Sequence, residues 1–309
     1  MIISIVDNWS LVKKSHREFL GKKINKFLKS KVVRLGPPLP VHCFIYQARR
    51  DILSGSHAAM KRSIQLYKSY IGRMALPDQV LFKEVLTELF NYKSFTSKEG
   101  AWNAYSLCST SPSRTCPYCN QAFAFTVTGS QSAYRPTLDH FYSKEHYPHL
   151  ALTLNNLIPS CYACNSSLKG RKDFFGTPHL HPLFDAENVE FYFVHPDRSV
   201  MDISADFENI KDKLIIKARA RVPCDKTKNS LSTFLVNERY LYSSLEAVKF
   251  AKAKISFDTN VLSLFAFPRE AIEREILQFH PNDYKHSILG KMYECIYMEL
   301  EKAKAKAKS

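Results

Sequence analysis

The sequence contains no run of about twenty consecutive apolar residues, which is the length that a membrane-spanning helix requires. The opening stretch, MIISIVDNWSLVKKSHREFLGKK, places its short apolar segment before the basic one, which is the reverse of the order in a secretory signal. The chain also lacks an internal repeat and a GxxxxGK[ST] loop for nucleotide phosphates. These absences predict a cytoplasmic protein that has no membrane association and leaves any use of ATP to a partner.

Disulfides are rare in the cytoplasm, so the eight cysteines of the chain need another explanation. Four of them form two CxxC pairs, one in TCPYCN and one in CYACN: Cys116, Cys119, Cys161 and Cys164. The other four are scattered, and we expect each to be an ordinary buried thiol: Cys43, Cys108, Cys224 and Cys295.

Acidic residues are outnumbered, with 29 Asp and Glu against 44 Lys and Arg, which gives a formal net charge of +15. A basic protein of this size usually meets an acidic partner, and nucleic acid is the first candidate. An anionic membrane surface, an acidic protein or a solvated lysine-rich surface would also explain the charge. The 309 residues, 45% of them apolar, are enough for one large domain or two ordinary ones.

Helical periodicity dominates both ends of the chain. Leu20, Ile24, Phe27 and Leu28 share one face of an amphipathic helix whose other faces are rich in lysine, a surface suited to nucleic acid, to a partner or simply to solvent. GPPLP at 36–40 must end that helix. We expect further helices at 57–73, at 77–92 and from about 229 to a frayed basic tail, EKAKAKAKS, and strands at VEFYFV and at 212–222.

Two CxxC pairs can close a tetrahedral four-thiolate zinc site, because the tight turn within each pair directs both sulfurs to one point. The pairs of this chain are about forty residues apart, which is wider than in a zinc ribbon, so a folded insertion must separate them. A redox pair of the thioredoxin kind is the alternative. A thioredoxin-like redox pair lies in a βαβ unit, which this sequence does not predict here, and such a pair would not need a second CxxC. The pattern therefore favours structural Zn²⁺.

The insertion carries residue types that suit catalysis. Asp139 and His140 end a short strand expected from Arg135, and Asn165 begins a short expected helix directly after Cys164. A carboxylate and an amide oxygen suit Mg²⁺, and a neighbouring histidine can act as general base on water. Singly, each residue has a structural explanation, as a turn cap, a helix cap or a core histidine. Their combination between four cysteines favours a catalytic site.

These residues resemble the HNH, or ββα-metal, endonuclease family. The resemblance rests on CPYC and CYAC, on LDH, on NNL before the third cysteine, and on CN with a lysine four residues later. The letters of the family name fall on His140, Asn156 and Asn165. More narrowly, DHFYSKEHYPHLAL and NLIPSCYACNSSLKG are similar to the PtuB family of HNH subunits from Septu-type antiphage systems, including those found beside retrons. The similarity covers roughly 115–172.

The resemblance implies a role for each matching residue. Asp139 and Asn165 would hold a catalytic Mg²⁺ or Mn²⁺. His140 would take a proton from the attacking water, and Asn156 would lock the loop by hydrogen bonds to the backbone. The resemblance further implies a structural Zn²⁺ on the four cysteines.

Substrate contacts and partners also follow from the resemblance. Lys169 and Arg171 would contact phosphate groups of a nucleic acid. A PtuA-like ATPase of the ABC type would control the nuclease, and a retron reverse transcriptase with its non-coding RNA is a further candidate partner. The expected fold is α+β, with a zinc-stapled ββα-metal module at 111–200 between a helical region at 1–110 and a mainly helical region at 201–309.

Several histidines near the motif keep two interpretations. His146 and His149, in KEHYPHL, are expected to be surface or packing residues, with substrate contact as the alternative. His179 and His181, in HLHPLFD, would share one face of a strand, where a structural role is favoured over a metal or phosphate contact. Tyr142 is a candidate for lining a nucleic-acid groove.

Three functions fit the sequence: a metal-dependent nuclease acting in defence, a non-catalytic zinc-containing nucleic-acid-binding module, and a subunit that docks an ATPase. The retained Asp139, His140 and Asn165 favour the nuclease. The choice between DNA and RNA stays open, because attack by water does not need a 2′ hydroxyl. Sequence specificity, nicking or double-strand cutting, the trigger and the stoichiometry stay open too.

Overall fold

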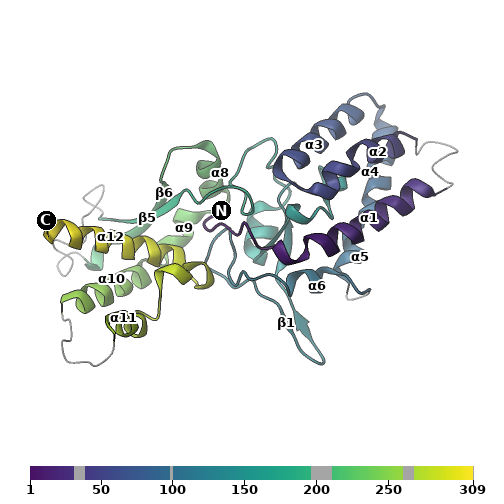
Figure 1. The fold of residues 1–309 in the computed structure, drawn as a ribbon. Helices are drawn as coiled ribbons and strands as arrows, with labels where there is room; N and C mark the ends of the chain where they lie inside the picture. Colours follow the sequence, from purple (N-terminus) through teal and green to yellow (C-terminus); the bar gives the residue numbers. More distant parts are fainter. Residues whose placement is uncertain (31–38, 98–99, 196–210, 260–267, 309) are drawn as a thin grey trace. The chain divides into compact units, whose positions relative to one another are not determined.

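A computed structural model describes residues 1–30, 39–97, 100–195, 211–259 and 268–308 (Figure 1). The chain forms two compact units. We call Ile5–Pro112 with Ala124–Asp185 the N-terminal unit, and Met1–Ser4 with Ser113–Phe123 and Ala186–Ser309 the C-terminal unit. Each unit is built from separate stretches of the chain. The expected module boundaries near 110 and 200 stay predictions.

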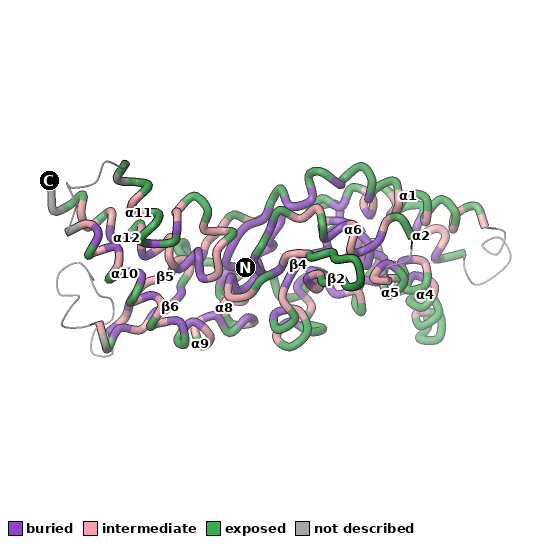
Figure 2. Tube along the Cα trace, turned by 90° about the horizontal axis from the view of Figure 1, so that it is seen from below, coloured by how far each residue is buried: buried purple, intermediate pink, exposed green. Residues whose placement is uncertain are grey.

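Amphipathic helices make up the first half of the N-terminal unit. The expected helices are present, although Gly36–Pro38 lie outside the described residues. Leu20 and Ile24 are buried on α1, whereas Phe27 and Leu28 are half-buried near its end. Figure 2 shows buried and exposed residues alternating along these helices. Their bounds are η1 (Ser10–Val12), α1 (Lys13–Lys29), α2 (Leu39–Ser54), α3 (His57–Ile71), α4 (Leu76–Leu89), α5 (Tyr92–Thr96) and α6 (Ala104–Cys108).

Two short antiparallel sheets follow in the N-terminal unit. β1 (Val127–Thr128) pairs with β2 (Ala133–Tyr134), and β3 (Thr137–His140) pairs with β4 (Leu157–Ser160). The expected strand ending in Asp139 and His140 is therefore confirmed as β3. Between β3 and β4 the chain makes two 3₁₀ turns, η3 (Pro148–Leu150) and η4 (Leu154–Asn156).

The helix expected after Cys164 has a different form. η5 (Ala163–Lys169) is a π-helix, in which the chain winds one residue wider than in an α-helix. It ends at Gly170, whose φ of 51° is in the left-handed region that glycine adopts without strain, and the Gly170 N–H donates to the Asn165 carbonyl at 2.9 Å. π-turns occur often at functional sites.

The C-terminal unit packs helices against one hairpin sheet. VEFYFV forms β5 (Val189–Val194), as expected, and it pairs antiparallel with β6 (Ile215–Ala220). EKAKAKAKS continues the last helix through Lys308, so the expectation of a frayed tail is wrong. The other elements are η6 (Lys211–Lys213), α8 (Asp225–Thr233), α9 (Val236–Leu241), α10 (Ser244–Thr259), α11 (Arg269–Leu277), η7 (Pro281–His286) and α12 (Gly290–Lys308).

The four scattered cysteines differ in exposure. Cys108 is buried and Cys43 and Cys295 are half-buried, but Cys224 is exposed at the start of α8, so its expected burial is wrong. Burial raises the pKa of the Cys224 thiol, and hydrogen bonds with Thr227 and Asn188 outweigh this and lower it from its ordinary value.

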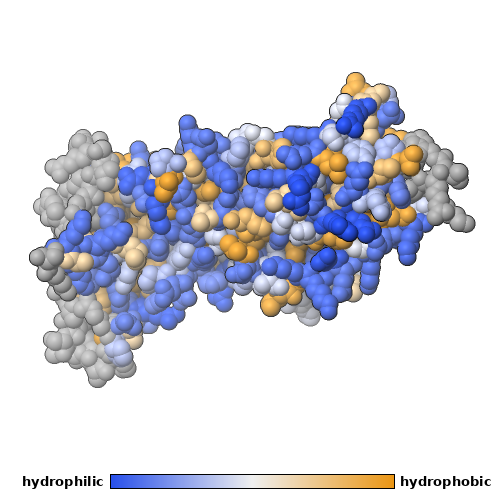
Figure 3. Space-filling model, turned by 45° about the horizontal axis from the view of Figure 1, so that its top comes forward, coloured by the Kyte–Doolittle hydropathy of each residue, from blue (hydrophilic) through white to orange (hydrophobic). Residues whose placement is uncertain are grey.

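The face of the molecule in Figure 3 is mostly hydrophilic, with separate hydrophobic groups between the polar ones. Within the described residues, no helix has both the length and the apolar character needed to cross a membrane.

A buried lysine joins three helices of the C-terminal unit. Lys254 on α10 has a side chain only 1% exposed, and its ammonium lies 2.6 Å from Asp258, 2.9 Å from Glu273 on α11 and 2.5 Å from Glu301 on α12. Lys304 approaches Asp258 from the other side, at 2.8 Å. The Lys254 ammonium thus pairs with carboxylates from three helices, which would otherwise repel one another, and Lys304 adds a second positive charge at Asp258.

Replacing Lys254 by methionine is expected to destabilise the protein by about 3–5 kcal/mol, because the carboxylates lose their compensating charge while the apolar stem is retained. Urea unfolding followed by circular dichroism would measure the change. Lys249→Met is the matched control, since Lys249 is exposed on the same helix. Equal stabilities of the two variants would contradict a structural role for the cluster.

Candidate active site and metal centre

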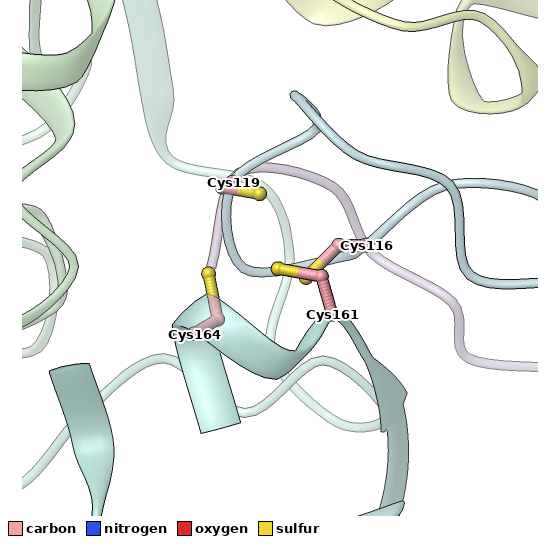
Figure 4. A group of neighbouring side chains, drawn as sticks. All are labelled: Cys116, Cys119, Cys161 and Cys164. Carbon is pink, nitrogen blue, oxygen red and sulfur yellow. The ribbon is translucent and has the colours of Figure 1, made fainter. Parts of the chain in front are cut away.

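Four cysteines converge in the structure. Cys116, Cys119 and Cys164 are buried, Cys161 is half-buried, and their sulfur atoms all lie within 4.8 Å of one another. Figure 4 shows the four side chains pointing toward a common space. A tetrahedral zinc site with Zn–S bonds of about 2.3 Å has sulfur separations of roughly 3.8 Å, so this reduced cluster is compatible with zinc.

The turn that carries the first pair has its own support. Asn120 follows Cys119 with a φ of 52°, a left-handed conformation that asparagine tolerates better than most residues. The turn is closed by a bond from the Asn120 N–H to the Cys116 carbonyl at 2.8 Å, and the Gln121 N–H lies 3.4 Å from the Cys119 sulfur. The Asn120 amide also accepts from the Lys291 N–H at 2.8 Å and donates to the Ser287 carbonyl at 3.0 Å. The sequence interpretation did not single out Asn120, although an asparagine directly after a CxxC turn is its signal.

His140 is fixed by its two neighbours. Its Nε2 lies 3.0 Å from the Ala151 carbonyl, and the Tyr92 ring meets it edge-on at 4.4 Å. Because a carbonyl only accepts, Nε2 must carry the proton and Nδ1 holds the lone pair of the neutral ring. Burial, together with the charges of Lys144 and Lys169, lowers the pKa of His140 to about 3 despite the bond to Ala151. The ring is therefore neutral at pH 7.

Tyr92 was not identified from the sequence, because nothing in its local pattern indicates a contact with His140.

Asn156 closes the loop that supplies this carbonyl. The side chain is fully buried and makes three bonds to the backbone: it accepts from the Tyr142 N–H at 2.8 Å and donates to the carbonyls of Tyr142 and Leu150, each at 3.0 Å. Its own carbonyl accepts from the Phe141 N–H at 2.9 Å. The loop from 141 to 156 is thereby tied at both ends, directly after His140 and directly before β4.

Asp139 lies beside His140 on β3 and pairs with a lysine. Lys169 Nζ is 2.9 Å from Asp139 Oδ1 and 2.6 Å from the His140 carbonyl. Both side chains are almost completely buried, at 2% and 1% exposure. The family resemblance implies a phosphate contact for Lys169, whereas the structure turns its ammonium inward.

Asn165 and Arg171 lie nearer to the surface. Asn165 is half-buried on η5, which packs against β3, and its side-chain amide has no hydrogen-bond partner among the described residues. The side chain of Arg171 is 83% exposed and pairs with Glu145 at 2.8 Å. The Lys169 ammonium therefore joins Asp139 and His140 in one bonded group, and Asn156 fixes the loop whose Ala151 carbonyl bonds to the His140 ring. Asn165 lies on η5, which packs against β3, and Arg171 lies on the surface.

The N-terminal helices brace the 141–156 loop from several sides. His16 on α1 bonds to the Leu152 carbonyl at 2.7 Å, and Trp9, just before η1, donates to the carbonyl of Leu157, the first residue of β4, at 3.0 Å. The Thr153 hydroxyl reaches the carbonyl of Ile52 on α2 at 3.4 Å. The position of the Ala151 carbonyl thus depends on contacts distant in sequence.

Three of the four remaining candidate histidines are buried, and His146 is exposed. His149 is fully buried, bonds to Ser63 on α3 at 3.2 Å and stacks on Tyr67. His146 is exposed and bonds to the Arg171 carbonyl at 3.0 Å. His179 and His181 are buried in irregular chain, so the strand expected there is wrong.

Tyr142, a candidate for a nucleic-acid groove, is 1% exposed. Its hydroxyl contacts His57 Nε2 at 3.0 Å. It is a core residue in this structure.

A cavity of about 660 Å³ opens next to His140. Tyr92 and Ala151, which both contact the His140 ring, form part of its wall. Its other walls come mainly from α4, the residues that follow it and the start of the 141–156 loop. They include three lysines and three glutamates: Lys83, Lys93, Lys144, Glu84, Glu88 and Glu145.

Replacing Asn156 by alanine is expected to cost about 3 kcal/mol of stability, because the Tyr142 N–H and carbonyl lose their bonds to the side chain and the Leu150 carbonyl keeps only the Thr153 N–H. Chemical denaturation would measure the loss. Asn155→Ala is the matched control, since the half-buried Asn155 side chain makes one bond, to the Gly55 carbonyl at 3.1 Å, and about 1 kcal/mol is expected. A smaller loss for Asn156 than for Asn155 would contradict the closing role.

Purified protein is expected to contain about one zinc ion per chain, measured by atomic emission on the folded protein. Cys161→Ser should remove the zinc and lower the melting temperature, because three thiolates hold the ion weakly. Cys43→Ser, which alters a thiol outside the cluster, should retain it. Full zinc content in Cys161→Ser would exclude the cluster as the site.

Comparison with known proteins supports the same region. Residues 116–171 match the family model of HNH endonuclease, and this stretch contains both CxxC pairs, β3, β4 and η5. No curated protein and no solved structure gives a significant match to the chain. An HNH domain implies divalent-metal use and a nucleic-acid substrate. The chain thus contains an HNH endonuclease domain whose four cysteines gather in one cluster.

Proposed function

We propose that this protein is a metal-dependent endonuclease that hydrolyses phosphodiester bonds in nucleic acid. DNA is the favoured substrate, and structured RNA such as tRNA is the alternative. The observation that carries the proposal is the geometry of His140: the Ala151 carbonyl fixes its ring in one tautomer, and it directly follows Asp139 on β3.

His140 acts as the general base. Its Nε2–H bond to the Ala151 carbonyl leaves Nδ1 to accept the proton of a water molecule. The same carbonyl stabilises the imidazolium that forms when the proton arrives. The Tyr92 ring limits rotation of the imidazole, so the base is held in one orientation.

Asp139 and Asn165 are the residues that would hold Mg²⁺ or Mn²⁺. The residues fit by their donor chemistry: a carboxylate on β3 and an amide oxygen on η5 are the hard ligands that these ions prefer. When bound, such an ion supplies Lewis-acid stabilisation of charge on the phosphate and on the leaving 3′ oxygen.

Basic residues around this site would bind the polymer. Arg171 is largely exposed, and Lys83, Lys93 and Lys144 line the cavity next to His140 together with Glu84, Glu88 and Glu145. Contacts of this kind bind phosphate groups without reading sequence. The net charge of +15 favours the same kind of partner.

We further propose a role as effector of an antiphage defence system. The support is the resemblance of DHFYSKEHYPHLAL and NLIPSCYACNSSLKG to PtuB subunits, together with the lack of a GxxxxGK[ST] loop. A PtuA-like ABC-type ATPase would then restrain the nuclease, and a retron reverse transcriptase with its RNA would be a further partner. Purified protein that degrades host DNA at full rate without any partner would contradict this restraint.

A non-catalytic subunit that binds nucleic acid or docks an ATPase is the second candidate. The long helical stretches and the zinc-compatible cluster fit it as well as they fit a nuclease. The fixed orientation of the His140 ring favours the nuclease, since a binding module has no use for an oriented base.

His140→Ala is expected to lower the cleavage rate by roughly 10²- to 10⁴-fold, the usual contribution of a general base. The assay would follow plasmid DNA and total tRNA with Mg²⁺ or Mn²⁺, with the protein alone and with any ATPase encoded beside it. His42→Ala is the control, since His42 lies on α2 and bonds to the Leu28 carbonyl. Zinc-loaded wild-type protein that binds nucleic acid but cuts neither polymer would favour the non-catalytic alternative.

A further inference from the structure

Lys169 has an unusual environment for a lysine in a nucleic-acid enzyme. Its side chain is 1% exposed. The ammonium donates to Asp139 Oδ1 at 2.9 Å and to the His140 carbonyl at 2.6 Å, so it bonds to both residues that carry the proposed chemistry. A buried ammonium needs such partners, because its removal from water is costly.

Aromatic side chains hold the lysine in this orientation. The ammonium lies 4.9 Å from the centre of the Phe174 ring. Phe174 in turn stacks on His179 at 3.6 Å and meets Phe141 edge-on at 5.2 Å. His179 is fixed by a bond to the Thr177 carbonyl at 2.6 Å. The His179 ring therefore helps to hold Phe174, which contacts the lysine, and this role needs neither metal nor phosphate.

This environment opposes a phosphate contact. To reach a phosphate, Lys169 would have to leave both oxygen partners and abandon a buried carboxylate. Arg171, two residues further on, has its side chain 83% exposed and could reach a phosphate without such a loss. The two cations thus differ in what they can contact, although they are close in sequence.

We infer that Lys169 is a positioning residue: it orients the Asp139 carboxylate and the His140 backbone, and it competes with a divalent cation for that carboxylate. The inference rests on the proposed function. Two cations that share one carboxylate repel each other strongly at short distance. Lys169 therefore weakens metal binding while it holds the carboxylate in the orientation that catalysis needs.

The test separates metal binding from polymer binding in the full-length, zinc-loaded protein. Lys169→Met removes the charge and the donor. Lys169→Gln removes the charge but keeps a donor for one oxygen, and Arg171→Gln is the exposed control. Mn²⁺ affinity would be measured by electron paramagnetic resonance without nucleic acid. Duplex DNA binding would be measured over a salt series without added divalent metal, and cleavage at saturating Mn²⁺.

Lys169→Met is expected to tighten Mn²⁺ binding and to lower the cleavage rate by roughly 10- to 100-fold, the usual effect of removing a group that orients a metal ligand. DNA affinity and its salt dependence should stay at the wild-type level. Lys169→Gln should also tighten Mn²⁺ binding and lose less of the rate. Arg171→Gln should weaken DNA binding, reduce the salt slope by about 0.9 and leave Mn²⁺ affinity unchanged.

Other outcomes overturn the inference. Unchanged Mn²⁺ affinity with weaker and less salt-dependent DNA binding in Lys169→Met would make Lys169 a phosphate contact. A parallel loss of Mn²⁺ affinity, zinc and rate in both Lys169 variants would make its role purely structural. The proposed function fails separately, if wild-type protein binds Mn²⁺ but cleaves no polymer.

Discussion

The bond between the His140 ring and the Ala151 carbonyl is the interaction on which the candidate site depends. It selects the tautomer, fixes the ring plane and decides which nitrogen is basic. A carbonyl can do this only if the loop that carries it is rigid. Asn156 provides that rigidity with three side-chain bonds to loop backbone, so a residue without any ionisable group controls the chemistry of its neighbour.

The helices of the N-terminal unit belong to the same arrangement. α1 and α2 contact the 141–156 loop through His16 and Ile52, and α3 contacts it through Ser63. These segments precede the loop by about a hundred residues, yet they surround the backbone that the histidine depends on. The HNH motif of this chain is therefore supported by helices well outside the stretch that matches the family model.

Local sequence pattern predicted the features that depend on local physics. Alternation identified β6, helical periodicity identified α1 and α3, and CxxC spacing identified the cysteine cluster. The burial of the Lys169 side chain could not be predicted from local pattern, because a lysine in a basic segment usually indicates a solvent-facing side chain. Only the approach of β3 and Phe174 shows otherwise. The contact of Tyr92 with His140 depends equally on tertiary packing.

The π-turn of η5 also affects how this site could change between related proteins. The turn holds one residue more than an α-helical turn between the Asn165 carbonyl and the Gly170 N–H. Loss of a single residue from this turn would restore α-helical winding and rotate every following side chain by about 100°. The Lys169 ammonium would then leave Asp139, although no residue of the bonded group had been substituted. In related chains, we therefore expect the number of residues in this turn to be conserved as strictly as the residues of the site. A relative that lacks one residue of the turn would have a differently arranged site.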